Sequence, residues 1–187
     1  MNLSIDQQIQ TSKPKTTISW WNIIGKIFVF VILTIFAFQL FTAAHPWIFL
    51  DSINLLIHEA GHLIFSFFGK FIYFLAGSLF QCLIPISFLI YFFRTKQYFA
   101  TGFSLFWLGD NLISVATYMK DARTLTLPLL GGETHDWNWL FSHMGLLKYD
   151  QLIGTVIFLL GTICVICALA LSLIIIHHEI RLKLTNI

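Results

Sequence analysis

Two histidines four residues apart, with a glutamate between them, are the side chains of this sequence best suited to metal chemistry. They form the pentapeptide His58-Glu59-Ala60-Gly61-His62. On an α-helix, positions i and i+4 lie on the same face, so both imidazoles would point toward one spot. Two neutral imidazoles, a third protein ligand and a water make an open catalytic zinc site. Glu59 would lie close enough to accept a proton from that water, as in zinc hydrolases of the H-E-x-x-H type.

The pentapeptide lies inside an apolar run over residues 47–68. A motif of three fixed residues also occurs by chance, and a polar clamp between two helices would use the same side chains. However, a charged or strongly polar group at the centre of a bilayer costs roughly 2.5–3.5 kcal/mol on insertion scales. Three such groups within five residues therefore favour metal binding by His58 and His62 over packing alone.

The composition is typical of an integral membrane protein. Of the 187 residues, 57% are hydrophobic and 11% are charged, whereas soluble domains have about 25% charged residues. The formal net charge of +2 is too small to indicate a nucleic-acid partner. We interpret the lysines and arginines as topology markers, and their distribution favours a cytoplasmic amino terminus. We expect a polar tail over residues 1–19 and a single transmembrane helical domain over residues 20–187.

Five apolar segments are long enough to cross a bilayer as helices. Their expected bounds are 23–41, 47–68, 71–93, 99–121 and 152–176, with a loop over 122–150. The middle three segments have polar or small residues at helical spacing: Asp51, Asn54, His58, His62 and Ser66; then Gly77, Ser78, Gln81 and Pro85; then Asp110, Ser114, Thr117 and Asp121. Polar stripes in lipid must face one another or water. We therefore predict an all-α integral membrane protein of about five transmembrane helices, with a three-helix polar core.

At the pentapeptide and these stripes, the sequence resembles the site-2-protease-like family of intramembrane zinc metalloproteases. The resemblance covers residues 47–121 and extends to the loop up to residue 139. It implies that His58 and His62 bind Zn²⁺ and that Glu59 is the catalytic acid–base. It also implies that Asp121, on a later core helix, is the third metal ligand. The substrate implied by the family is a transmembrane or membrane-adjacent polypeptide.

Three other residues compete with Asp121 for the position of third ligand. The family usually has an Asp-Gly step there, preceded by a stretch that contains proline. Here Ala122 follows Asp121, and no proline lies in the ten residues before it. Asp110 better matches the membrane depth of the histidines if both helices are straight. His135 and Asp136 would reach the site if the loop folds back onto the pentapeptide helix.

Three functions fit these features. The first is a membrane-embedded zinc peptidase, which we favour. The second is a non-enzymatic membrane protein whose polar core holds a structural metal or binds a partner's transmembrane helix. A closed site with four ligands, made by His58, His62, Asp121 and either His135 or Asp136, would indicate this second function. The third is a small transporter, but transporters commonly contain internal repeats, and the sequence shows none.

Overall fold

A computed structural model describes residues 19–42, 49–128 and 134–185 of the chain. The described residues are helical and include no strand. The elements are α2 (Trp20–Leu40), α3 (Phe49–Phe65), η1 (Ser66–Phe68), α4 (Lys70–Arg94), α5 (Tyr98–Lys120), α6 (Asp136–His143), η2 (Leu147–Tyr149) and α7 (Asp150–Thr185). The predicted polar tail, apart from Ser19, lies outside the described residues.

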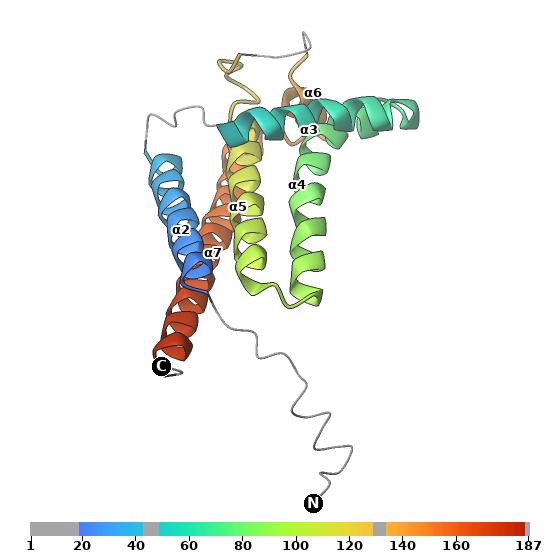
Figure 1. The fold of residues 1–187 in the computed structure, drawn as a ribbon. Helices are drawn as coiled ribbons and strands as arrows, with labels where there is room; N and C mark the ends of the chain where they lie inside the picture. The colour runs from blue at the N-terminus through green and yellow to red at the C-terminus, as the bar shows by residue number, and fades with distance from the viewer. Residues whose placement is uncertain (1–18, 43–48, 129–133, 186–187) are drawn as a thin grey trace, which may run out of the picture.

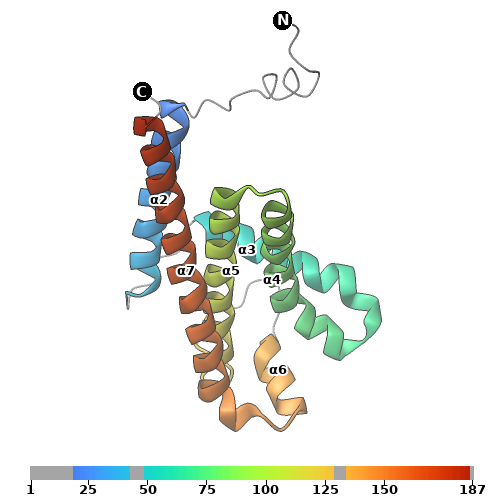
Figure 2. The ribbon, with the colours of Figure 1, turned by 90° about the horizontal axis from the view of Figure 1, so that it is seen from below.

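Four long helices run alongside one another, and α3 lies across them near one end (Figure 1). Helix α5 packs against both α4 and α7, while α2 packs against α7. Helix α3 packs mainly against α4, and the short helix α6 also contacts α4. Figure 2 shows α6 beside the same end of α4 that α3 covers. The pentapeptide helix and the loop helix therefore meet at one end of the bundle.

Three of the described helical segments are long and apolar enough to cross a membrane: Trp20–Leu40, Lys70–Arg94 and Leu147–Thr185. The predicted number of five was therefore too high for this part of the chain. Helix α3 has 17 residues, which at 1.5 Å per residue is about 26 Å, less than the roughly 30 Å of a hydrocarbon core. Helix α5 has 23 residues, but Asp110 and Asn111 in its middle make it less apolar than the other long helices.

The predicted polar stripes do meet between helices. Asn54 on α3 donates a hydrogen bond to Asp110 on α5, and His58 on α3 bonds to Gln81 on α4. Two predicted stripe residues, Ser66 and Thr117, are exposed instead. The opposite face of α3 and η1 is apolar, since Leu56, Leu63 and Phe67 are 72%, 75% and 77% exposed. An apolar outer surface of this kind is suited to lipid.

The predicted helix bounds agree closely with the structure over α4 and α5. The last helix is longer than expected: it covers Asp150–Thr185 instead of 152–176. The predicted loop over 122–150 contains α6 and η2, neither of which was expected. This helical loop is important for the site, because α6 folds back onto α4.

Close packing between α5 and α7 depends on two glycines that face each other. A Cβ atom added to Gly161 would lie 2.8 Å from the carbonyl oxygen of Gly109 and 3.1 Å from the backbone nitrogen of Ile113. Backbone atoms cannot move aside as a flexible side chain can. The α5–α7 contact therefore requires glycine at position 161, as small residues commonly do at membrane helix interfaces.

We predict that Gly161→Ala will destabilise the protein by about 1–3 kcal/mol, the usual cost of overpacking a core. The matched control is Gly25→Ala on α2, where nothing lies within 4 Å of the added Cβ. The control should be neutral or stabilising, because alanine is the better helix former. Unfolding of both variants in the same detergent would measure the difference, and equal stability would contradict the proposed packing.

Candidate metal site

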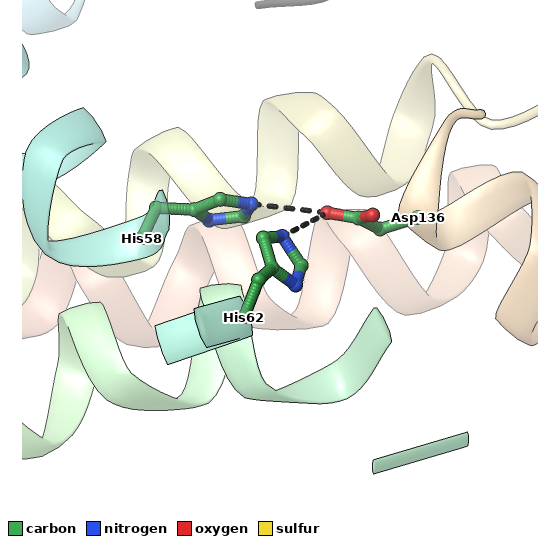
Figure 3. A group of neighbouring side chains, drawn as sticks. All are labelled: His58, His62 and Asp136. Carbon is green, nitrogen blue, oxygen red and sulfur yellow. Dashed lines mark hydrogen bonds and ion pairs between the residues drawn. The ribbon is translucent and has the colours of Figure 1, made fainter. Parts of the chain in front are cut away.

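Two imidazoles and one carboxylate converge between α3 and α6 (Figure 3). The Nε2 atom of His58 lies 3.0 Å from Oδ2 of Asp136, and Nε2 of His62 lies 3.2 Å from the same oxygen. All three residues are buried, and their ligand atoms lie within 4.8 Å of one another. No other group of three or more His, Cys, Asp or Glu side chains gathers in this way among the residues that the structure describes.

Both histidines have their second ring nitrogen occupied by a group on α4. The Nδ1–H of His62 donates to the backbone carbonyl of Tyr73 at 2.7 Å, and Nδ1 of His58 lies 2.8 Å from the side-chain oxygen of Gln81. Because a carbonyl oxygen can only accept, these bonds place the ring proton on Nδ1. In each neutral imidazole, Nε2 then presents a lone pair toward Asp136. This arrangement of an oriented imidazole backed by a carbonyl is typical of metal-binding histidines.

The convergence leaves two nitrogen lone pairs facing a carboxylate oxygen. Such a group needs positive charge between its members, either as a proton on an imidazole or as a bound cation. Two histidines and one carboxylate form a donor set that Zn²⁺ uses in open catalytic sites. The residues present therefore fit a zinc ion by both donor chemistry and tautomer.

Electrostatics favour an ionised Asp136 beside the histidines. Burial alone would raise the pKa of Asp136, but the adjacent His58 and His62, when a proton lies between an Nε2 atom and the carboxylate, hold it below its usual value. Burial alone would lower the pKa of His62, but Asp136 raises it above its usual value. Glu59 is half-buried on the same helix, and its charge acts on His62 in the same direction as that of Asp136. Glu59 therefore lies near the group without being one of its three converging members.

Room for an ion depends on a glycine of α4. A Cβ atom added to Gly77 would lie 2.5 Å from Nε2 of His58 and 2.6 Å from Nε2 of His62. The α4 backbone therefore passes directly beside the two candidate ligand atoms. A second glycine, Gly61, allows α3 to reach this position, because its own Cβ would lie 2.5 Å from the carbonyl oxygen of Ala76.

Helix α6 is held in place by hydrogen bonds from its first two residues, Asp136 and Trp137. The backbone N–H of Asp136 donates to the hydroxyl of Tyr118 on α5 at 3.1 Å. The indole N–H of Trp137 donates to Ser78 on α4 at 3.0 Å. These bonds connect the loop helix to both neighbouring long helices. Asp136 therefore has a defined position although it comes from a connecting segment.

Asp121, the third ligand that the family resemblance favoured, is not brought to the histidines. Its carboxylate accepts hydrogen bonds of 2.6 Å from the hydroxyls of Thr124 and Thr126. It also accepts from the backbone N–H groups of Thr126 at 2.9 Å and Leu127 at 3.0 Å. Burial opposes the charge on Asp121, but these four bonds hold its pKa well below the usual range. The carboxylate orders the start of the loop.

The other two candidates for third ligand also have different partners. The Nδ1 atom of His135 accepts the backbone N–H of Asn138 at 3.2 Å, which caps α6, and its Nε2 lies 3.5 Å from Asp121. Burial lowers the pKa of His135 despite the nearby charge of Asp121. Asp110 accepts a hydrogen bond of 2.8 Å from Asn54, away from the histidines. Of the four candidates considered from the sequence, the structure brings Asp136 alone to the pentapeptide.

Three further residues of the site were not identified as functional in the sequence. Gly77 was predicted only as a member of the polar or small stripe over residues 71–93, and Tyr118 was not among the predicted stripe residues. Gln81 was predicted to make a contact between helices, and its bond from α4 to His58 on α3 is such a contact. The helical spacing of Gly77 and Gln81 on α4 was the one signal in the sequence that placed them on a common face.

We predict that Asp136→Asn will lose zinc and that the matched variant Asp121→Asn will retain it. Both changes replace a carboxylate by an amide of nearly the same shape, but only Asp136 lies with the two histidines. Metal analysis of purified protein in detergent should give about one zinc per chain for the wild type, as for a mononuclear site, and none for His58→Ala. Zinc lost in Asp121→Asn alone would contradict this ligand set.

We also predict that Gly77→Ala will weaken zinc binding, because the new methyl group would occupy the space beside both Nε2 atoms. The loss should be at least about 10–100-fold, the scale seen when groups that orient metal ligands are removed. Gly25→Ala provides the control for a glycine-to-alanine change in a helix. Unchanged zinc affinity in Gly77→Ala would mean that the ion does not lie between these nitrogens.

No protein-family model matches the chain, and neither the curated proteins nor the solved structures include a significant match. The function must therefore be inferred from the geometry of the site.

Proposed function

We propose that this chain is a multi-pass membrane-embedded zinc metallopeptidase of the site-2-protease-like type. The observation that supports it most strongly is the convergence of His58, His62 and Asp136, with both Nδ1 atoms bonded to α4. The adjacent Glu59 completes the set of residues that zinc hydrolases require. Its substrate would be a transmembrane or membrane-adjacent polypeptide.

The number of converging ligands favours a catalytic site over a structural one. A structural zinc site usually has four protein ligands, whereas a catalytic site has three and an open position. Asp121 and His135, which would have closed the site, bond to the loop and to the start of α6 instead. Within the described part of the chain, three ligands remain. This arrangement supports hydrolysis over a purely structural metal.

The chemistry follows from the residues around the open position. A zinc ion bound there would supply Lewis acidity, which lowers the pKa of a coordinated water toward about 7. Glu59 takes a proton from the attacking water and then gives it to the departing amine. Asp136 and the two imidazoles keep the reacting groups together in a buried space. Gly77 allows this space to exist beside the α4 backbone.

The chain would cross the membrane four times, with α3 at one surface. Helix α5 is covered on both sides by α4 and α7, so its polar residues need not face lipid. Because α3 follows the end of α2 and precedes the start of α4 at the same end of the bundle (Figure 1), it adds no crossing. The ion pair between Lys26, near the start of α2, and Glu179, near the end of α7, places these two helix ends at the same end of the bundle.

With this topology, the metal site would lie near one membrane surface. Gly77 is seven residues from the start of α4 at Lys70, which is about 10 Å along the helix. The four basic residues at this end are Lys70, Lys120, Arg123 and Lys148, and the other seven lie at the opposite end or precede α2. The larger number of basic residues on the side of the amino terminus favours a cytoplasmic amino terminus. The bond that is cut would then lie near the non-cytoplasmic surface.

We predict that Glu59→Gln will keep zinc and lose at least about 10²–10⁴-fold in turnover, the usual contribution of a general acid–base. Wild-type and variant protein would be reconstituted in liposomes with a set of single-helix transmembrane peptides, and cleavage followed by mass spectrometry. Asp121→Asn is the control, because it loses a carboxylate that lies outside the converging group. Cleavage by Glu59→Gln at the wild-type rate would exclude the mechanism.

A further inference from the structure

A second buried polar cluster joins α3 to the middle of α5. Asn54 is its centre: its amide nitrogen donates to Oδ2 of Asp110 at 2.8 Å, and its oxygen accepts from the indole N–H of Trp107 at 2.7 Å. The amide nitrogen of Asn111 donates to the same Asn54 oxygen at 3.2 Å and to the carbonyl of Trp107 at 2.9 Å. Asp110 and Asn111 have no exposed surface.

The hydrogen bonds fix the orientation of both amides. If Asn54 were flipped, its nitrogen would face the indole donor and its oxygen would face a carboxylate. If Asn111 were flipped, its oxygen would face two other oxygens. The hydrogen-bond partners therefore determine which side-chain atom of Asn54 and of Asn111 is the nitrogen and which is the oxygen.

Two oxygens remain without a partner in this cluster. They are Oδ1 of Asp110 and Oδ1 of Asn111, and both are buried. Because both atoms only accept, the missing partner must supply positive charge or a proton. The negative charge of Asp51 on α3 also acts on Asp110. No lysine, arginine or histidine forms an ion pair with Asp110 among the residues that the structure describes.

The cluster is distinct from the histidine site. Asp110 is ten residues from the end of α5 at Lys120, which is about 15 Å along the helix and near its middle. Its unpartnered atoms are all oxygens, whereas the histidine site combines nitrogen and oxygen donors. A donor set made of carboxylate and amide oxygens alone suits hard cations such as Na⁺, Mg²⁺ and Ca²⁺, whereas zinc sites usually include nitrogen or sulfur donors.

We propose that Asp110 and Asn111 form a second site that binds a hard cation. Asn54 bonds directly to Asp110 and lies one helical turn before His58 on α3. A cation at this site therefore fixes the helix that presents both candidate zinc ligands. The site does not depend on the proposed peptidase activity, because neither its residues nor its test involves the histidines.

Thermal unfolding of the purified protein in detergent tests this site. The probes are NaCl, MgCl₂ and CaCl₂, each compared with N-methyl-D-glucamine chloride at equal ionic strength. We expect the wild-type unfolding temperature to rise with each tenfold increase of at least one of the three metal ions, and the rise to disappear in Asp110→Asn. Asp51→Asn should show a smaller rise, and it provides a second variant if Asp110→Asn does not fold.

The control is Asp121→Asn, which removes a carboxylate that bonds to the loop after α5 and should respond to the hard cation as the wild type does. If no metal ion stabilises the wild type beyond N-methyl-D-glucamine, the proposal is wrong, and Asp110 is a neutral acid or bonds to water. The proposal is also wrong if Asp110→Asn responds as strongly as the wild type, because the stabilising ion would then bind elsewhere.

Discussion

The contact of α3 with the first turns of α4 is the constraint on which the candidate metal site depends. It requires glycine at position 61, where the two backbones approach, and at position 77, where the α4 backbone faces both Nε2 atoms. The same contact provides the carbonyl of Tyr73 and the side chain of Gln81, which accept from the two Nδ1 atoms. One helix contact thus determines where the imidazoles lie, which nitrogen carries the proton, and how much space remains.

An excess of acceptor atoms is common to both polar clusters of this molecule. At the histidine site, two lone pairs face the carboxylate of Asp136. In the middle of α5, Asp110 and Asn111 each have an oxygen without a partner. Burial makes uncompensated charge costly, so each cluster is stable only when a cation or a proton is present. Nitrogen donors at one cluster and oxygen donors at the other would allow the two sites to select different ions.

The parts of this structure that were predictable from the sequence are those set by local geometry. The spacing of His58 and His62 predicted a shared face, because helical periodicity depends on a few neighbouring residues. Helices α4 and α5 were predicted almost to the residue for the same reason. The crosswise position of α3 was not predictable in this way, because its direction depends on packing against α4. An apolar run long enough to cross a membrane was instead an amphipathic helix with a buried polar face and an apolar outer face.

The identity of the third candidate ligand could not be predicted for the same reason, because it also depends on packing between distant parts of the chain. Nothing local in the sequence distinguishes Asp136 from other acidic residues, since its position depends on how the loop folds onto α4. Asp121 nevertheless contributes to that folding: its carboxylate orders Thr124–Leu127 through four hydrogen bonds. It also lies 3.5 Å from His135, the residue that caps α6 immediately before Asp136. Asp121, which the family resemblance predicted as third ligand, thus supports the residue that lies with the histidines. A carboxylate from the connecting loop lies where one from a core helix was expected.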